Sequence, residues 1–412
     1  MNSAKLFKIP LRLLPDVLLW IFIAALVGFL AGSASAGFLL ALDFVTHTRI
    51  ENPWLLYLLP WAGVLIAFLY SRYGKNTDAG NNLLIDEIHN PKKVVPLRMA
   101  PFVLLGTLIT HLFGGSAGRE GTAVQMGGTL ADQLTLLFRF DAEKRKTLLM
   151  AGISAGFSSV FGTPLAGAVF GLEVLDIGRL RYQAILPCFI AAIVADRVCL
   201  QWGVHHTVYS IAQVPEISVL TVLWSLVAGI CFGLCAYAFS WSNHRLTHLL
   251  KQTFASPLVR AFIGGVAVIL GAALLQSDRY LGLGIPVIVE SFQGPVPAYD
   301  FLFKIIFTVV TLSSGFKGGE VTPLFFIGAT LGNALAWILP LPTGLLAGMG
   351  FVAVFAGAAN TPLACLLMAM ELFGTGSAIY AALACVMSYI FSGHAGIYHS
   401  QKIEVYKHAQ EN

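Results

Sequence analysis

Charged side chains are scarce in this sequence. Lys, Arg, Asp and Glu make up 11% of its 412 residues, and hydrophobic residues make up 57%. A soluble globular domain carries about 25% charged residues. A chain with so little charge cannot cover a water-facing surface, which excludes a soluble enzyme. The formal net charge is only +4, so the composition does not indicate a nucleic-acid partner.

Paired cysteines and metal-ligand patterns are also missing from the sequence. The six cysteines lie inside or beside apolar runs, and none belongs to a C-x-x-C pair. Six histidines lie in or near the apolar runs, and they do not show the spacing of metal ligands along one helix. They are His111, His205, His206, His244, His394 and His399. We therefore expect cysteines that serve packing, no metal site and no cofactor.

Long uncharged runs are what the sequence does contain. Residues 321–370 carry no charged side chain, which is enough for two membrane crossings of roughly 20 residues each. Further uncharged runs that approach or exceed one crossing are 17–42, 52–71, 99–118, 147–172, 217–244, 261–277 and 372–401. The pattern predicts an all-α polytopic membrane protein with roughly ten to fourteen membrane segments, some of them too short to cross alone.

Basic residues flank both ends of the membrane region. Lys5, Lys8 and Arg12 precede the first apolar run, and Lys402 and Lys407 follow the last one. Because Lys and Arg are retained on the cytoplasmic side of a membrane, we expect both ends of the chain in the cytoplasm. An even number of crossings follows from that orientation.

Two blocks of the sequence resemble each other. Residues of the block that ends at Glu173 recur at one constant offset in the block that ends at Glu371. We therefore expect two related halves, residues 1–205 and 206–412, with inverted topology and with broken helices that meet at a central site. Glu173 and Glu371 are interpreted as structural partners in the repeat rather than as ion ligands.

One interruption of the apolar pattern combines glycine with charge. The segment Gly114-Gly-Ser-Ala-Gly-Arg-Glu-Gly-Thr122 places Arg119 and Glu120 between two apolar runs, where charges are costly and usually functional. A helix that begins near Glu120 would direct free N–H groups at an anion, and the glycines let the backbone approach it. Glu120 would compete with that anion until protonation releases it, which couples anion passage to proton passage. The alternative is a carboxylate that only stabilises the helix dipole.

A second interruption has the same composition. The segment Ser313–Pro323 contains glycines, Glu320 and the hydroxyl of Thr322, and its proline interrupts regular helix geometry. We expect this segment to face the same site. The alternative is that Lys317 only neutralises Glu320, as an ion pair without a transport role.

A third interruption carries two adjacent amides. Asn81 and Asn82 follow Gly80, and each amide offers two N–H donors, which suit a small and strongly hydrated anion. The alternative interpretation of Gly-Asn-Asn is a helix C-cap or a turn.

One motif of an enzyme occurs in the sequence. Gly152-Ile-Ser-Ala-Gly156 matches the G-x-S-x-G nucleophile pattern, but an apolar helix does not supply the strand–turn–helix context that the motif needs. An intramembrane hydrolase that uses Ser154 is one rival hypothesis. A membrane scaffold that transports nothing is another.

Taken together, the three interruptions resemble the CLC family of chloride channels and anion/proton antiporters over nearly the whole chain. Gly118-Arg-Glu-Gly-Thr122 is similar to the family's G-R-E-G-P segment, whose Glu is the gate. Gly318–Pro323 stands where the family has its second glycine-rich segment, and Tyr398 stands where a pore tyrosine is expected. The resemblance implies the CLC fold, with two inverted-repeat halves around a central anion site.

The sequence also departs from the chloride-selective members of the family. Those members carry G-S-G-I-P at the first segment, where this sequence has Gly80-Asn-Asn-Leu-Leu-Ile85 and no serine. Thr122 replaces the usual proline of the gate segment, and Glu320 and Thr322 stand at positions that are apolar in chloride members. These departures resemble the fluoride/proton antiporter branch.

The resemblance implies a role for each of these residues. Asn81 would replace the selectivity serine, Glu120 would be the gate and proton carrier, and Glu320 would lie on the ion and proton path. The implied anion-binding set is Asn81, Asn82, Gly118, Arg119, Gly121, Thr122, Thr322 and Tyr398. Fluoride accepts stronger hydrogen bonds than chloride, which makes an amide in place of a hydroxyl plausible.

The resulting functional prediction is a secondary transporter rather than an enzyme. We expect a fluoride/proton antiporter in the plasma (inner) membrane of a prokaryote, which exports fluoride while protons move inward. The resemblance also implies a homodimer with one pore per subunit, and the chain length leads us to expect no cytoplasmic regulatory domain. The alternative is a chloride/proton antiporter or a chloride channel of the same family.

Overall fold

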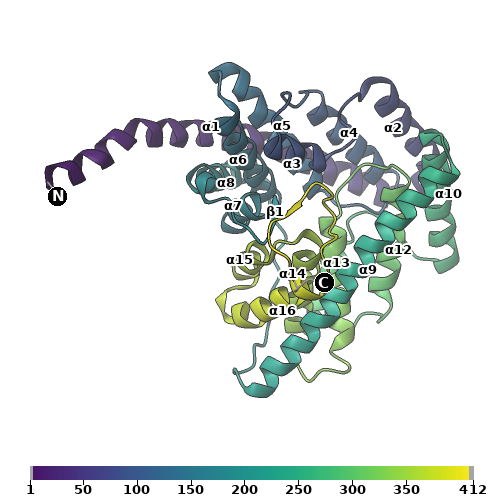
Figure 1. Cartoon of the computed structure of the whole chain (residues 1–412). Helices are drawn as coiled ribbons and strands as arrows, with labels where there is room; N and C mark the ends of the chain where they lie inside the picture. Colours follow the sequence, from purple (N-terminus) through teal and green to yellow (C-terminus); the bar gives the residue numbers. More distant parts are fainter. Residues whose placement is uncertain (1–2, 408–412) are drawn as a thin grey trace, which may run out of the picture.

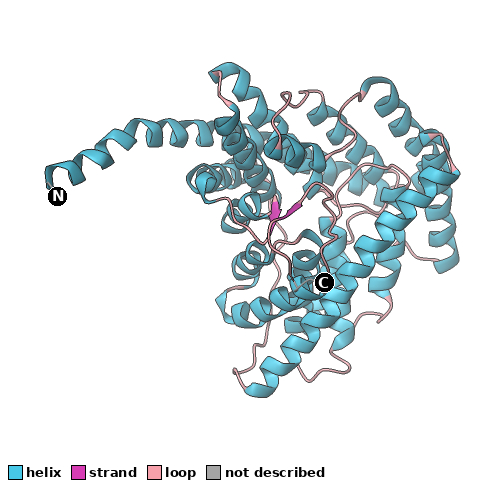
Figure 2. Ribbon diagram, viewed as in Figure 1, coloured by secondary structure: helices cyan, strands magenta, loops and turns pink. Residues whose placement is uncertain are grey.

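The computed structural model describes residues 3–407, and describes side chains from Leu13 onward. Nearly all of the regular structure is helical, and the two strands of the described chain have two residues each (Figure 2). The side chains of Lys5, Lys8 and Arg12, on which the expected orientation partly rests, lie outside the described residues.

The elements follow one another along the chain in an almost purely helical order (Figure 1). Up to Gln201 they are α1 (Ser3–Glu51), η1 (Pro53–Leu58), α2 (Leu59–Tyr73), α3 (Asn81–His89), α4 (Met99–Leu112), α5 (Glu120–Phe138), α6 (Ala142–Phe161), α7 (Pro164–Glu173), β1 (Asp176–Ile177), η2 (Tyr182–Ala184) and α8 (Ile185–Gln201). From Val219 onward they are α9 (Val219–Thr253), α10 (Pro257–Leu275), α11 (Ile285–Gln293), α12 (Asp300–Ser313), α13 (Val321–Leu335), α14 (Thr343–Ala359), α15 (Pro362–Phe373), η3 (Thr375–Ser377), α16 (Ala378–Phe391) and β2 (Lys402–Ile403). The η elements are short 3₁₀ helices.

The lengths of the helices suit a membrane. Within the described residues, 5 helical segments are long and apolar enough to cross a bilayer, and further apolar helices have 10–17 residues. Figure 1 shows that the N-terminal end of α1 extends away from the body of the molecule. The expected all-α polytopic membrane fold, with some segments too short to cross alone, is confirmed.

Two helices that begin at matched prolines are stabilised reciprocally. The Glu371 carboxylate accepts hydrogen bonds from two backbone N–H groups at the start of α7, at 2.9 Å each. The Glu173 carboxylate accepts two from the start of α15, at 3.0 and 2.8 Å. Each carboxylate satisfies free N–H groups at the positive end of the other helix. The interpretation of Glu173 and Glu371 as structural partners is therefore confirmed.

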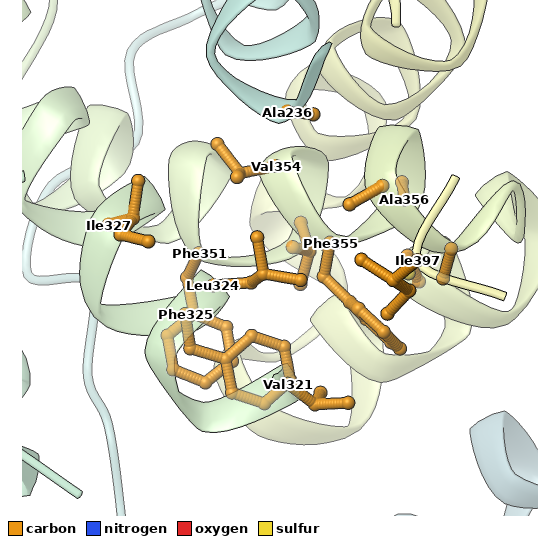
Figure 3. Packing of buried hydrophobic residues seen from close by; sticks show 14 of the residues in the cluster. Ala236, Val321, Leu324, Phe325, Ile327, Phe351, Val354, Phe355, Ala356 and Ile397 are labelled. Atoms are coloured by element: carbon orange, nitrogen blue, oxygen red, sulfur yellow. The ribbon is translucent and has the colours of Figure 1, made fainter. Parts of the chain in front are cut away.

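The largest part of the core lies where α13 packs against α14. Phe325 and Phe351 stack with ring centroids 4.0 Å apart, and Phe355 lies beside them (Figure 3). The two helices approach so closely that a Cβ on Gly328 would lie 2.0 Å from the carbonyl oxygen of Gly350. Small residues at such crossings are typical of helix packing in membranes. This packing fixes the N-terminal end of α13, which belongs to the site described below.

The chain after α16 forms a C-terminal strap, residues 396–407. Its strand β2 pairs in parallel with β1. The Gln401 side chain donates hydrogen bonds to backbone carbonyls at the ends of α7 and α14, at 2.9 and 2.8 Å. The Ser400 N–H donates to the Asn82 side chain at 3.1 Å. These bonds hold Tyr398, a member of the strap, against helices from both ends of the chain.

A buried ion network ties α6 to α3 and α5. Arg145 donates two hydrogen bonds to the Asp132 carboxylate, at 2.7 and 2.8 Å, and one to Glu87 at 2.9 Å. All three residues are buried. Removal of one partner from such a network leaves the others buried without compensation.

Replacing Arg145 should therefore destabilise the fold strongly. We expect Arg145→Met to lower the free energy of unfolding by about 3–5 kcal/mol. Thermal unfolding of the purified protein measures the change. The matched control is Lys146→Met, which removes an ion pair with the exposed Glu143 and should cost less than about 1 kcal/mol. Equal unfolding temperatures for the two variants would contradict the role of the network.

Candidate functional site

Three helices begin at the three interruptions of the sequence. α5 begins at Glu120, α13 begins at Val321, and α3 begins at Asn81. The residue before Asn81 is Gly80, which has a φ of 60° and so adopts a backbone conformation that other residues rarely take. The interpretation of the Gly-Asn-Asn segment as a helix C-cap is wrong, because the segment starts a helix.

The three helix starts lie against one another. The backbones of Gly118 and Gly319 pair as an antiparallel bridge, with N–H to carbonyl distances of 2.6 and 2.8 Å. A Cβ on Gly121 would lie 3.1 Å from the amide nitrogen of Asn81 and 3.2 Å from the Cα of Gly319. Glycine therefore allows the backbones of α5 and α13 to meet beside the Asn81 amide. The expected convergence of the interrupted segments is found in the structure.

The Glu120 carboxylate is fully buried at the start of α13. It accepts hydrogen bonds from the Thr322 N–H at 3.0 Å, from the Arg119 N–H at 3.1 Å, and from the Thr322 hydroxyl. The Arg119 guanidinium lies 3.7 Å away. These are the donors that an anion at the N-terminus of a helix would use. The carboxylate thus occupies donors that could serve a bound anion.

The backbone next to this carboxylate leaves no room for a side chain. A Cβ on Gly118 would lie 2.8 Å from a carboxylate oxygen of Glu120 and 2.9 Å from the carbonyl oxygen of Gly319. Any side chain there would displace the carboxylate or open the bridge between the two glycines. Glycine at this position is therefore a requirement of the site.

Two cavities lie near the three helix starts. The Glu120 cavity, of about 20 Å³, is lined by Glu120, Thr322, Arg119 and the loop residues His206 and Tyr209. Its volume is about that of one water-sized particle. The Asn81 cavity, of about 200 Å³, is lined by residues of the second and third interruptions, by Gln125 of α5 and by the strap; among them are Asn81, Asn82, Glu320 and Tyr398.

The two asparagines of the Asn81 cavity differ in their contacts. The Asn82 side chain accepts the hydrogen bond from the Ser400 N–H. The Asn81 amide lies beside Gly121, and its carbonyl oxygen is buried without a hydrogen-bond partner among the described residues. Asn82 is therefore engaged in holding the strap, whereas Asn81 keeps hydrogen-bonding capacity at the site.

Lys317 does not pair with Glu320. Its ammonium group lies 2.5 Å from the Asp78 carboxylate and 4.1 Å from the centroid of the Tyr70 ring. Lys317 also lowers the pKa of the Asp78 carboxyl, which lies in the loop before α3. The alternative that Lys317 neutralises Glu320 is wrong, and Glu320 faces the Asn81 cavity without that cation.

The Thr122 side chain points toward α4. Its hydroxyl forms a hydrogen bond of 2.6 Å with the hydroxyl of Thr107 in α4. Thr122 lines neither the Glu120 cavity nor the Asn81 cavity. The structure therefore places its side chain in the packing between α4 and α5.

Sequence reasoning missed several residues of the two cavities. Gln125 lies one turn into α5, and its amide is close to Gly80. A Cβ on Gly80 would lie 3.3 Å from the Gln125 amide nitrogen. A polar side chain in the apolar run after Glu120 was the feature of the sequence that could have indicated a role for Gln125. His206, Tyr209, Phe325 and Phe351 line the Glu120 cavity, and a loop or an apolar helix gives no local signal for such placement.

The residue of the enzyme-like motif is used for packing. Ser154 lies in the middle of α6 and donates a hydrogen bond to the carbonyl of Ala168 in α7 at 3.3 Å. A nucleophile elbow requires a sharp strand-to-helix turn, and α6 is a continuous helix at this point. Among the described residues, no group of three or more His, Cys, Asp or Glu could hold a metal ion.

Comparison with known proteins decides the family. A family model described as voltage gated chloride channel, the CLC family, matches residues 62–393. The chain belongs to the CLC family. The resemblance drawn from the three interruptions is thereby confirmed.

Relatives of this CLC chain carry names of anion transport proteins. The chain is 58% identical over 404 residues to a protein of Pseudomonas syringae pv. tomato named "Chloride/fluoride channel protein", covering 97% of this chain and 89% of that one. It is 29% identical over 392 residues to the "H(+)/Cl(-) exchange transporter ClcA" of Cronobacter sakazakii, covering 85% and 81% of the two chains.

Solved structures confirm the CLC fold. The structure of a CLC-type fluoride/proton antiporter superposes on this CLC chain with a TM-score of 0.91 at 36% identity, covering 98% of this chain and 100% of that one. The fold is shared with a slow cyanobacterial Cl⁻/H⁺ antiporter at a TM-score of 0.80 and 20% identity, covering 92% and 96%. The chain is thus a multi-pass membrane protein of a family of anion channels and transporters.

Proposed function

We propose that this CLC chain is a fluoride/proton antiporter that exports fluoride from the cytoplasm in exchange for inward protons. The observation that carries the proposal is the position of the Glu120 carboxylate. It accepts hydrogen bonds from the Thr322 N–H and hydroxyl at the start of α13 and from the Arg119 N–H just before α5. An anion that enters this position must displace the carboxylate.

Protonation of Glu120 is the event that couples the two ions. A neutral carboxyl group is a weaker acceptor than a carboxylate, so protonation weakens its bonds to Thr322 and Arg119. The protonated side chain leaves, fluoride takes the same donors, and loss of the proton on the other side returns the carboxylate. One fluoride and one proton thus use the same position in turn.

The preference for fluoride rests on Asn81 and on the size of the Glu120 cavity. A space of about 20 Å³ suits a water-sized ion such as fluoride better than the larger chloride. The Asn81 amide can offer two N–H donors to an ion at Gly121. The names of the 58% identical relative and of the 36% identical structure both include fluoride, which supports the same choice.

The Asn81 cavity is the proposed route between the cytoplasm and the gate. Glu320 and Tyr398 line it, and we assign Glu320 to the ion and proton path and Tyr398 to the anion path. Gly118, Gly121 and the Arg119 N–H form the backbone part of the anion site. Thr122 supports this backbone through Thr107 rather than through contact with the ion.

The length of α1 supports the proposed orientation in the membrane. Between Leu13 and Arg49 this helix is about 54 Å long, which exceeds the hydrocarbon thickness of roughly 30 Å. Arg49 therefore lies at the face opposite the helix start, and α2 returns from that face toward the Asn81 cavity. We assign the Asn81 cavity to the cytoplasmic side of a prokaryotic plasma membrane, with both chain ends on that side.

The subunit organisation completes the proposal. The reciprocal capping by Glu173 and Glu371 supports two related halves, residues 1–205 and 206–412, in inverted topology. By likeness to the family, we propose a homodimer with one pore in each subunit. Crosslinking in lipid, with a covalent dimer expected, tests the oligomeric state.

The alternative is chloride transport by the same site. The 29% identical relative that is named an H⁺/Cl⁻ exchange transporter is the observation that favours it. Purified protein in liposomes, with fluoride and chloride electrodes, separates the two. We expect fluoride efflux with little chloride efflux, and equal fluxes would assign this CLC chain to the chloride transporters.

The two rivals from other classes have simple tests. Ser154→Ala should leave fluoride efflux intact, because Ser154 is buried in the packing of α6 and bonds to Ala168 of α7. Loss of a measured hydrolase turnover in this variant would instead favour the enzyme. A scaffold without transport would show no fluoride efflux above that of empty liposomes.

Thr322 should control how firmly Glu120 is held. Thr322→Val removes the hydroxyl that donates to the carboxylate and keeps the backbone N–H. Because a hydrogen bond to a charged group contributes roughly 1.5–3 kcal/mol, we expect a change of about tenfold or more in fluoride efflux rate. Thr330→Val is the matched control, because the Thr330 hydroxyl bonds within its own helix. Equal efflux rates would contradict the role of Thr322.

A further inference from the structure

A third cavity, of about 360 Å³, lies beside the Glu120 cavity and is separate from it. This Arg49 cavity is enclosed by the C-terminal end of α1, the end of α4 and residues 278–287 around the start of α11. Most of its wall is apolar, from residues such as Ile50, Leu281 and Leu283. Its size and its apolar lining are those of a site for a small organic molecule.

Two arginines of this wall each keep a nitrogen without a partner. Arg49 donates from Nη2 to Asp278 at 2.8 Å, but its Nε is buried without a partner among the described residues. Arg279 is bonded to Asp300 at 2.8 Å and to Glu290 at 2.9 Å, but its Nη2 is buried and unpaired in the same sense. Buried donors without acceptors are uncommon and call for an explanation.

A buried histidine belongs to the same wall. His111, at the end of α4, is 3% exposed and lines the cavity. Arg49 is 7% exposed. Two arginines with an unpaired nitrogen thus line one largely apolar cavity, although Asp278, which also lines it, already accepts a hydrogen bond from Arg49. An added hydrogen-bond acceptor would pair with the two arginine nitrogens that Asp278, Asp300 and Glu290 leave without a partner.

We propose that the Arg49 cavity binds an organic anion, in which one carboxylate, phosphate or sulfonate group is attached to an apolar body. The charged group would accept hydrogen bonds from Arg49 and Arg279, which bind such groups well. The apolar body would replace water along Ile50, Leu281 and Leu283. A lipid headgroup with its chain and a free organic acid share this chemistry.

Occupation of the cavity would act on the ion path. Gly114, which opens the segment that leads to Glu120, belongs to the wall, and a Cβ there would already lie 3.1 Å from the Arg49 Nε. Ile285 lines both the Arg49 cavity and the Glu120 cavity. A bound anion would restrain this segment, so we expect it to inhibit transport from the face opposite the Asn81 cavity.

The first test uses octanesulfonate, which stays ionised and carries no protons across a bilayer. We expect millimolar octanesulfonate to raise the unfolding temperature of the purified protein, because a ligand of the native state stabilises it. Neutral 1-octanol at the same concentration should not raise it. Equal effects of both compounds would overturn the proposal, since apolar contact alone would then explain binding. This readout does not depend on transport, so it can succeed even where the proposed antiport fails.

The second test uses variants of the wall. Arg49→Gln should weaken octanesulfonate binding by about tenfold or more, as expected for a lost charged hydrogen bond. Ile50→Trp, at a 64% exposed position of the wall, should fill the cavity and abolish binding without loss of folding. The exposed Arg72 at the end of α2 provides the matched control, Arg72→Gln. Unchanged binding by the Ile50 variant would overturn the site.

The third test measures the effect on the ion path and the source of the natural ligand. External octanesulfonate should inhibit fluoride efflux from proteoliposomes in the wild-type protein and not in Ile50→Trp; equal inhibition of both would overturn the coupling between cavity and gate segment. If phosphatidylglycerol in the vesicles weakens the inhibition relative to phosphatidylcholine alone, the natural ligand is a lipid headgroup. If it does not, a free organic anion is supported.

Discussion

Glu120→Gln is expected to abolish proton-coupled fluoride transport. Glutamine keeps the shape of the side chain and can accept the hydrogen bonds from Thr322 and Arg119, but it cannot carry a proton on and off. Proton movement in liposomes that contain the variant should fall to the level of empty liposomes. Glu120→Ala should have the same effect on proton movement, because it also removes the ionisable group.

Another glutamate supplies the control for this experiment. Glu143 is exposed and pairs with Lys146 at the start of α6, so Glu143→Gln should retain the wild-type rates of fluoride and proton movement. Thermal unfolding shows whether each variant is folded. Proton-coupled transport that survives in either Glu120 variant would refute the role of this carboxylate as gate and proton carrier.

Asn81→Ser is expected to lower the preference for fluoride over chloride. The serine hydroxyl offers one donor where the amide offers two, and it leaves more room beside Gly121. The loss of one hydrogen bond to a small anion corresponds to a factor of about ten in relative flux. Fluoride and chloride electrodes record both fluxes from the same liposomes.

The neighbouring asparagine is the matched control for selectivity. The Asn82 side chain is engaged with the Ser400 N–H, so Asn82→Ser should weaken the hold on the strap with little change in the ratio of fluoride to chloride flux. A larger change of this ratio in Asn82→Ser than in Asn81→Ser would transfer the selectivity role to Asn82. An unchanged ratio in both variants would contradict a selectivity role for this segment.

The helix starts of the site could be predicted because each one interrupts an apolar run. Glu120 and Glu320 are visible as charges in membrane segments, where desolvation makes an unneeded charge costly. Gly80 and Gly118 are visible as glycines, and their structural reasons are a positive φ and a close approach of backbones. These are local properties of the chain, so the sequence alone reveals them.

The partners of these groups could not be predicted, because they come from distant parts of the chain. Lys317 is near Glu320 in sequence, yet it pairs with Asp78 across 239 positions. Thr122 ends the gate segment, yet it lies on the side of α5 that faces α4, and its hydroxyl bonds to Thr107. Only the packing of α4, α5 and α13 decides these contacts.

The C-terminal strap shows the same limit for the fold. Nothing local in residues 396–407 predicts that Gln401 bonds to the ends of α7 and α14. The strap forms because helix ends leave carbonyl groups without partners, and a long polar side chain can satisfy them. Tyr398 is brought to the Asn81 cavity by this tertiary arrangement.

The central claim is that fluoride leaving through the Glu120 position drives protons in the opposite direction. Purified protein in liposomes loaded with fluoride, in fluoride-free medium at equal pH on both sides, tests it most directly. A fluoride electrode and a pH electrode record the external solution together. The account predicts that fluoride efflux is accompanied by proton uptake against the developing pH gradient. Fluoride efflux without proton uptake, with the membrane potential clamped, would contradict antiport and make this chain a channel.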